Sequence, residues 1–342
     1  MEKICISSKT KESLEELAIS LNHPKFRGLQ IFSWLNKECV TTFEEMTNLP
    51  KQLREQLEDN FYISYPTLLQ KEKSKDGSVK YLFRFGKEAI IESVLLKSAQ
   101  GFSVCISTQV GCKMGCVFCA SHIGGFVRNL SAGEILSQIY FIQKDIQTNI
   151  NNIVIMGIGE PLDNYQNTLN FIRLINDKNG QHKSARGITL STCGLVNKIY
   201  DLAAEGLQIT LAISLHAPND IVRQKIMPKV TSKYSIEELL EAARYYFEKT
   251  KRRITYEYTL IKNINDQKEH AHELGRRLKG TPSHINLVEL NAIKKLSFEK
   301  SGNTNHFAKI LKSYNIETTI RKSQGSDVSA ACGQLVNREF VE

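Results

Sequence analysis

The sequence predicts an α/β protein built on a partial (β/α)6 barrel, with a helical domain before it and a short β extension between the two. Three observations support this prediction. The chain has 342 residues, strand-like and helix-like segments alternate from about residue 104 onward, and the strand-like segments are apolar runs, which is typical of parallel strands covered by helices. The expected boundaries are 1–70 for the helical domain, 71–100 for the extension and 101–342 for the barrel.

The composition is that of a folded, basic protein. Hydrophobic residues make up 41% and charged residues 24%, which excludes a disordered or collagen-like chain. No apolar run approaches the roughly 18 residues that cross a bilayer, and the first residues lack the apolar core of a secretory signal, so we expect a cytoplasmic protein with no membrane partner. The net charge of +9 favours nucleic acid as a partner, although a solvated lysine surface would give the same value.

The first 70 residues are expected to be helical. Segment 25–38 places Phe26, Leu29, Ile31, Phe32 and Leu35 at near-helical spacing. Segment 48–61 contains Pro50 where a second helix would begin. Residues 71–100 change character, because Asp76-Gly77 is a turn signal between alternating β-branched and aromatic stretches. We therefore expect an antiparallel unit that links the two domains.

The barrel strands are expected at apolar runs that alternate with amphipathic segments. Two of those segments open with a capping box, Ser131 with Glu134 and Ser235 with Glu238. Barrels of this kind place their chemistry at the carboxyl ends of the strands. The predicted strands are 104–108, 152–157, 187–191, 208–215, 253–261, 284–290 and 316–321.

Three cysteines follow the first predicted barrel strand in the run CKMGCVFC: Cys112, Cys116 and Cys119. Structural zinc sites use four ligands in two separated pairs, and a redox pair needs only two cysteines. Three thiolates in one loop suit a [4Fe-4S] cluster with one iron left open, to which S-adenosylmethionine (SAM) could bind. A zinc knuckle or a chance grouping is the alternative interpretation.

This spacing at the top of a partial barrel resembles the signature of the radical SAM enzymes, which implies a TIM-like radical SAM barrel. Over almost its whole length the chain is similar to the RNA adenine methyltransferases of the RlmN and Cfr family, and most similar to the RlmN type. The stretches that carry the resemblance include FRGLQIFSWL, CISTQVGCKMGCVFCA, VIMGIGEPLDNY, AISLHAP and SDVSAACGQL.

The resemblance implies a radical mechanism, because carbon 2 of adenine is too electron-poor to attack a sulfonium methyl. Cys332 matches the cysteine that accepts a methyl group from one SAM. A second SAM is cleaved to a 5′-deoxyadenosyl radical, which activates the S-methyl group to bond to the adenine. Cys105 matches the thiol that releases the RNA by forming a transient disulfide bond with Cys332, and Glu92 matches the base that removes the ring proton. Without the resemblance, Cys105 would be interpreted as a core residue and Glu92 as an ordinary strand glutamate.

The resemblance also implies a pocket for SAM. Gly159 lets the backbone approach the ligand, and Glu160 is placed to accept a hydrogen bond from the methionine amino group. The remaining pocket candidates lie near the ends of later strands and are Ser191, Ser214, Leu215, His216 and Asn291. Cys5, Cys39 and Cys193 match no functional position and are expected to be incidental.

The substrates implied by the resemblance are an adenosine in the peptidyl-transferase centre of 23S rRNA and the adenosine 3′ of the anticodon in tRNA. The other expectations are a flavodoxin-like electron donor, a monomeric state and RNA docking on the helical domain. Basic residues are candidates for phosphate contacts, although charges on helices are usually solvated. These candidates are Arg128, Arg252, Arg253, Arg276 and Arg277.

Two alternatives stay open. The Cfr-type relatives methylate carbon 8 of adenine and confer antibiotic resistance. Pro161 favours the carbon-2 group, because the relatives often carry alanine at that position. A non-catalytic iron–sulfur RNA-binding protein would keep the cluster and the basic surface without turnover.

Overall fold

The computed structural model describes residues 3–99, 101–291, 293 and 298–336. Its barrel strands pair in parallel, each with the next along the sheet. All seven predicted strands are present, and their ends are shifted by at most three residues. The apolar runs that predicted these strands are buried in the core. They are β6 (Gly101–Cys105), β9 (Asn152–Ile155), β10 (Ile188–Thr192), β11 (Thr210–Ser214), β12 (Ile254–Leu260), β13 (Ser283–Glu289) and β14 (Glu317–Arg321).

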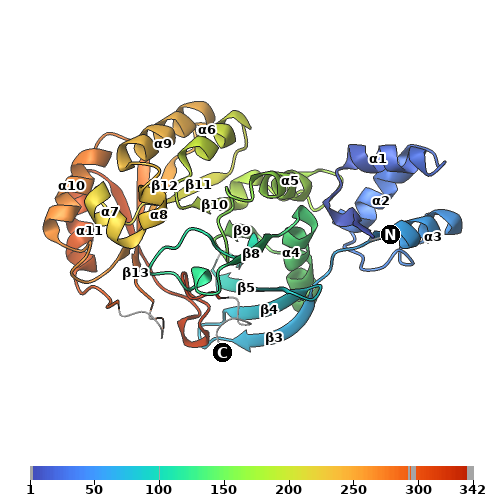
Figure 1. Ribbon diagram of the computed structural model, residues 1–342, viewed down its shortest axis with the longest axis horizontal. Helices are drawn as coiled ribbons and strands as arrows, with labels where there is room; N and C mark the ends of the chain where they lie inside the picture. Colours follow the sequence, from blue (N-terminus) through green and yellow to red (C-terminus); the bar gives the residue numbers. More distant parts are fainter. Residues whose placement is uncertain (1–2, 100, 292, 294–297, 337–342) are drawn as a thin grey trace.

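Helices connect these strands on the outside of the sheet (Figure 1). They are α4 (Ala132–Ile146), α5 (Tyr165–Asn176), α6 (Val196–Ala204), α7 (Asp220–Ile226), α8 (Pro228–Thr231), α9 (Ile236–Thr250), α10 (Lys268–Leu278) and α11 (Thr304–Ser313). Both predicted capping boxes are confirmed at the starts of α4 and α9. None of the helices within the described ranges is long and apolar enough to cross a membrane.

The β extension consists of β3 (Thr67–Lys73), β4 (Val79–Phe85) and β5 (Ala89–Ser98), which are antiparallel. The predicted turn at Asp76-Gly77 joins β3 and β4, and Gly77 has a φ of 89°. β5 also pairs with β6 over five positions, from Val94 opposite Cys105 to Ser98 opposite Gly101. The extension therefore continues the barrel sheet, which differs from the expected link between two separate units.

Ten strands form this single sheet, in the order β14, β13, β12, β11, β10, β9, β6, β5, β4, β3. Because β14 pairs only with β13 and β3 only with β4, the sheet is open, and the predicted partial barrel is confirmed. A second, two-stranded sheet was not predicted. It joins β7 (Gln109–Gly111) to β8 (Phe126–Asn129) at the two ends of the cysteine loop. Gly111 has a φ of 74° there, and a Cβ would lie 1.7 Å from the carbonyl oxygen of Gly125.

The N-terminal helices stand at one side of the barrel, next to α4 and α5 (Figure 1). They are α1 (Lys11–Ser20), α2 (Phe26–Asn36) and α3 (Lys51–Asn60), and the short strands β1 (Ile4–Cys5) and β2 (Phe61–Tyr62) pair beside them. The amide of Gly133 on α4 donates to the Ser8 hydroxyl at 2.9 Å. The Tyr140 hydroxyl donates to Oδ1 of Asn36 at 3.2 Å. Phe26 and Leu29 belong to the predicted apolar pattern of α2 but are 54% and 37% exposed.

Candidate functional site

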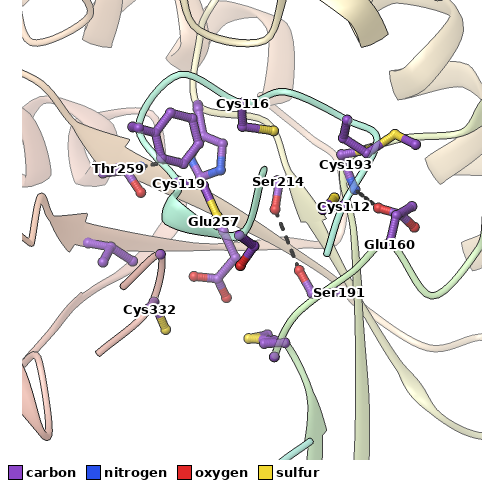
Figure 2. A pocket seen from close by; sticks show the side chains of 18 of the residues that line it. Cys112, Cys116, Cys119, Glu160, Ser191, Cys193, Ser214, Glu257, Thr259 and Cys332 are labelled. Atoms are coloured by element: carbon purple, nitrogen blue, oxygen red, sulfur yellow. Dashed lines mark hydrogen bonds between the residues drawn. The ribbon is translucent and has the colours of Figure 1, made fainter. Parts of the chain in front are cut away.

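Ten of the thirteen predicted site residues line one cavity at the carboxyl ends of the barrel strands (Figure 2). Its empty volume is about 980 Å³, including the open mouth. Figure 2 shows Cys332 entering from the C-terminal segment, apart from Cys112 and Cys116. The predicted residues that line the cavity are Cys112, Cys116, Cys119, Gly159, Glu160, Ser191, Ser214, His216, Asn291 and Cys332.

Backbone hydrogen bonds hold the cysteine loop against three different parts of the chain. The amide of Cys112 donates to Gly125 at 3.2 Å, that of Val117 to Ile226 at 3.0 Å, and that of Ala120 to Gly333 at 2.7 Å. The loop is therefore fixed by β8, by α7 and by the segment that carries Cys332.

Each of the three cysteines in the loop could bind one iron of a cubane [4Fe-4S] cluster. Within the described ranges no group of three Cys, His, Asp or Glu side chains is placed to hold a single metal ion. Burial raises the pKa of the Cys112 thiol to about 12 and also raises the pKa of Cys116 and Cys119. Cluster binding must therefore release protons from these thiols.

Glu160 is buried beside the cysteine loop, with both carboxylate oxygens on backbone donors. Oε1 accepts from the Leu162 amide at 3.0 Å, and Oε2 accepts from the Cys193 amide at 2.8 Å. Burial raises the pKa of Glu160, and these hydrogen bonds oppose the rise. Each carboxylate oxygen has a second lone pair, so the group can still accept from a ligand ammonium.

Polar groups of β10, β11 and β12 line the opposite wall. The hydroxyls of Ser191 and Ser214 are 3.5 Å apart. Nδ1 of His216 accepts from the Thr259 amide at 2.9 Å, so the proton of the neutral ring is on Nε2. Burial first, and then the Arg223 charge, lower the pKa of His216 to about 3. The His216 ring therefore stays neutral and offers one N–H donor.

Leu215 is the predicted pocket residue that the structure places elsewhere. Its side chain is fully buried in the core and does not line the cavity. The backbone of Leu215 links β12 to the Arg223 side chain. The Leu215 amide donates to the Glu257 carbonyl at 3.1 Å, and the Leu215 carbonyl accepts from Nε of Arg223 at 3.2 Å. The predicted role of Leu215 in the pocket therefore stays a prediction, and the contacts that the structure gives near the cavity are made by its main chain.

The C-terminal segment 325–336 carries Cys332 and is attached at several points. Nδ2 of Asn291 donates to the Cys332 carbonyl at 3.0 Å, and the Ser121 hydroxyl donates to Leu335 at 2.9 Å. The turn between β3 and β4 holds its other end, since the Gly325 amide donates to Asp76 at 2.7 Å. The β extension thus helps to position the predicted methyl-accepting cysteine.

A second cavity, with an empty volume of about 530 Å³, adjoins the first and is lined by both Cys105 and Cys332. All eight cysteines are free thiols, so the expected Cys105–Cys332 disulfide is absent from this state. Burial first, and then the Cys332 charge, raise the pKa of Cys105 to about 12. Cys105 is therefore a protonated, unreactive thiol here.

Glu92 lies on β5 beneath the C-terminal segment and lines neither of these two cavities. Its side chain is 1% exposed. Oε2 accepts from the Val336 amide at 2.9 Å, and Oε1 lies 3.7 Å from the buried ammonium of Lys80. The structure thus places the expected general base on β5, two residues before the Val94 that pairs with Cys105, and covers it with the segment that carries Cys332.

Several lining residues were missed by sequence reasoning, and among them are Cys193, Glu257 and Arg321. Burial, and after it the Glu160 charge, raise the pKa of Cys193, which was expected to be incidental. Oε1 of Glu257 accepts from Asn286 at 3.0 Å. The only available signal was a charged side chain within an otherwise apolar strand, as at Glu257 in ITYEYTL.

Arg321 ends β14 and lines both cavities. The Cys332 charge raises the pKa of Arg321, burial opposes the rise, and Glu257 and Cys105 add to it. A fixed cation therefore lines both cavities together with Cys332, and its charge opposes part of the rise in the pKa of Cys105.

The structure places other groups against most of the candidate phosphate-binding arginines. Arg128 forms a bidentate pair with Glu134 at 2.7 and 2.9 Å. Arg252 and Arg253 precede β12, at the amino end of the barrel and away from the cavity, and Arg253 pairs with Glu317. Arg277 pairs with Glu237 and Glu273, whereas Arg276 is exposed on α10. Arg253, Arg276 and Arg277 are all exposed, but Arg253 and Arg277 already pair with carboxylates.

Replacing Asp76 with alanine should loosen the C-terminal segment. Burial opposes ionisation of Asp76, but hydrogen bonds from Ser78 and Gly325 lower its pKa to about 2. The side chain is exposed, so we expect the variant to lose less than about 1 kcal/mol of stability and less than about fivefold in methylation rate. Limited proteolysis should show faster cleavage near Gly325.

The pH dependence of this contact follows from the lowered pKa. The contribution of Asp76 is present above its ordinary pKa of 3.8 and is lost as the pH falls toward about 2. Alanine at Asp59, exposed on α3, serves as the control. Unchanged cleavage in the Asp76 variant at neutral pH would contradict the assigned contact.

Comparisons with known proteins agree with this geometry. The family described as the radical SAM superfamily matches residues 106–274, and the ribosomal RNA large subunit methyltransferase N-terminal domain matches residues 6–63. The chain is 54% identical to a probable dual-specificity RNA methyltransferase RlmN of Clostridium tetani, over 97% of this chain and 95% of the relative. It is 51% identical to a protein of the same description from Alkaliphilus oremlandii, over 98% of both chains.

A crystal structure of a radical SAM methyltransferase from Sphaerobacter thermophilus has the same fold. It matches with a TM-score of 0.92 and 39% identity, over 97% of this chain and 99% of that one. The iron–sulfur and SAM chemistry of the radical SAM family is consistent with the cysteine loop and the cavity described above. Full-length similarity at this level establishes that the chain belongs to the RlmN family of radical SAM RNA methyltransferases.

Proposed function

We propose that this enzyme methylates carbon 2 of an adenosine in the peptidyl-transferase centre of 23S rRNA and carbon 2 of the adenosine 3′ of the anticodon in tRNA. The observation that carries the proposal is the position of Cys332, which lines both the cavity of the cluster cysteines and the cavity of Cys105. A methyl group on this sulfur would lie between a radical source and a second thiol. The description of the relatives as probable dual-specificity RNA methyltransferases supports two RNA substrates.

Cys112, Cys116 and Cys119 would hold the [4Fe-4S] cluster, and the polar wall of the cavity would hold SAM. When bound, these groups supply a methyl group and, after one-electron reduction, a 5′-deoxyadenosyl radical, so that two SAM molecules are used per methyl transfer. Glu160 would accept from the methionine ammonium, and Gly159 lets the backbone approach the ligand, since it has a φ of 106°. The remaining contacts to SAM are assigned to Ser191, Ser214, the Leu215 backbone, Nε2–H of His216 and Asn291.

Cys332 would act first, as the nucleophile that accepts the methyl group. Cys332 is exposed and lines the cavity of the cluster cysteines, and Arg321 lines the same two cavities as Cys332. Loss of one hydrogen atom from the S-methyl group then lets its carbon bond to the adenine, which links the RNA covalently to Cys332.

Glu92 and Cys105 would then release the RNA. The unpaired electron of the RNA adduct would return to the bound cluster, Glu92 takes the ring proton from carbon 2, and the Cys105 thiolate attacks the Cys332 sulfur. The S–CH₂ bond breaks, its electron pair goes to the methylene carbon, and a proton added there completes the methyl group. The resulting Cys105–Cys332 disulfide must be reduced by a cellular thiol before the next turnover.

The same steps require the C-terminal segment to move. Glu92 is covered by Val336, and the Cys105 thiol is protonated in the closed arrangement. Entry of the adenosine would lift segment 325–336, which exposes the carboxylate and hydrates the thiol. Some unstacking of folded RNA is expected for a base to reach this depth.

The helical domain, proposed as residues 1–70, would dock the RNA, the extension 71–100 would anchor the C-terminal segment, and residues 101–342 would carry the chemistry. Residues 337–342 of that last segment lie outside the described ranges. We further propose a cytoplasmic, monomeric enzyme that receives electrons from a flavodoxin-like donor.

The decisive experiment is anaerobic reconstitution with iron, sulfide, reductant and methyl-labelled SAM, followed by digestion of 23S rRNA and tRNA and mass spectrometry of the nucleosides. We expect labelled 2-methyladenosine from both RNAs. Finding only 8-methyladenosine would assign the enzyme to Cfr-type chemistry. Finding an intact cluster and RNA binding but no methylated nucleoside would favour a non-catalytic iron–sulfur RNA-binding protein.

A further inference from the structure

A lysine-rich groove lies on the outside of the cysteine loop. Its empty volume is about 1170 Å³, and its walls come from the loop itself, the start of α5, α6 and the region of α8. Within the loop, Lys113 and Met114 stand between Cys112 and Cys116. The charged and aromatic lining residues are Lys113, Asp163, Tyr165, Lys198, Lys229, Lys233 and Tyr234. We name this feature the lysine groove.

The lysine groove is positively charged. Four lysines and one aspartate line it, which gives a net charge of +3. Lys113 pairs with Asp163 at 3.0 Å, Lys198 pairs with Asp201 at 2.8 Å, and Lys233 is exposed. A surface of this charge and shape is complementary to an acidic protein face.

The lysine groove is built onto the cysteine loop. Nζ of Lys229 donates to the Lys113 carbonyl at 3.2 Å. Gly115 has a φ of 66°, and a Cβ there would lie 3.2 Å from the Lys229 side chain. A partner seated in the groove would therefore contact the loop that is proposed to hold the cluster.

The groove and the reaction cavity lie on two sides of this loop. Met114 is the one residue that lines both of them. Neither Cys332 nor Arg321 lines the groove, although the target adenosine must reach Cys332. The position therefore fits a partner that has to approach the cluster without entering the RNA path.

We propose that the lysine groove docks the electron donor, an acidic redox protein of the flavodoxin class. This inference rests on the proposed function, because radical cleavage of SAM requires one electron from outside the enzyme. Its reduced flavin is oxidised by one electron and the cluster is reduced by one electron, with no bond made or broken in the transfer. In this arrangement the four lysines orient the donor, and Met114 lies between the flavin of the donor and the proposed cluster.

The test compares the anaerobically reconstituted enzyme with the Lys198→Glu/Lys233→Glu variant. Lys309→Glu/Lys312→Glu is the matched control, since these lysines are exposed on α11 and do not line the groove. Binding of oxidised flavodoxin is measured by calorimetry at low and high salt. Cluster reduction by reduced flavodoxin is followed by stopped-flow absorbance, and methylation is assayed with dithionite as the reductant.

At low salt we expect the groove variant to bind flavodoxin with about tenfold lower affinity than the wild type. Reduction of its cluster by reduced flavodoxin should also be about tenfold slower, and both differences should shrink at high salt. Dithionite-driven methylation should stay within about twofold, and the control should match the wild type. If the charge reversal impairs folding, Lys198→Gln/Lys233→Gln should give a smaller loss of the same kind.

Unchanged flavodoxin binding and cluster reduction would overturn the proposal. Loss of RNA binding and of dithionite-driven methylation in the groove variant would also overturn it and would make the groove an RNA surface. Failure of the wild type to methylate RNA with either reductant would refute the proposed function instead, while calorimetry would still report whether the groove binds flavodoxin.

Discussion

Replacing Cys332 with alanine should reduce RNA methylation by about a thousandfold or more, while the cluster and its brown colour are retained. Alanine has no sulfur to accept the methyl group, and no other thiol lines both cavities. The three proposed cluster cysteines come from a separate loop, which is held by backbone hydrogen bonds to Gly125, Ile226 and Gly333 and not by the Cys332 side chain. Methylation is measured with labelled SAM, and cluster content by absorbance and iron analysis.

Alanine at Cys5 is the matched control, because Cys5 lies on β1 and lines none of the cavities described above. It should methylate RNA like the wild type. Wild-type activity in the Cys332 variant would refute the proposed methyl acceptor. Loss of the cluster in that variant would show instead that Cys332 supports the cysteine loop.

Alanine at Cys105 should trap the enzyme on its RNA. Without this thiol the Cys332 sulfur cannot be displaced, so the first turnover ends in a covalent complex and multiple turnover falls by about a thousandfold. The substitution removes one buried sulfur from strand β6, which should cost about 1 kcal/mol or less in stability. Labelled RNA should migrate with the protein on a denaturing gel.

The Cys105→Ala/Cys332→Ala double variant distinguishes this trap from non-specific crosslinking, since it should form no complex. Release of free methylated RNA by the single variant at the wild-type rate would contradict the resolving role of Cys105. Such a result would point to another thiol or to an added reductant as the agent of release.

Much of the fold could be predicted because its signals are local. Buried apolar runs mark β9 to β14, and the serine–glutamate pairs at Ser131 and Ser235 mark the starts of α4 and α9. Two features could not be found in this way. The three-residue strand β7 is too short for a periodic pattern, and the pairing of β5 with β6 is a long-range contact that leaves no trace in local spacing.

The residues of the site also fall into those with a local sequence signal and those without one. Cys112, Cys116 and Cys119 were predictable because their spacing within one loop carries the chemistry. Glu257 and Arg321 were not, since they meet Cys332 only after strands distant in sequence come together. The contribution of Leu215 through its main chain also has no side-chain signature.

The pairing of β5 with β6 also limits how this enzyme can be recombined with its relatives. A chimaera joined at residue 100 would take β5 and β6 from different parents, although these strands pair along five positions. The β extension of one parent would then have to fit the barrel sheet and the C-terminal segment of the other. A junction at residues 64–66, just before β3, leaves every rung of that ladder within one parent. Exchange of RNA-docking modules should therefore succeed at the second junction and give insoluble protein at the first.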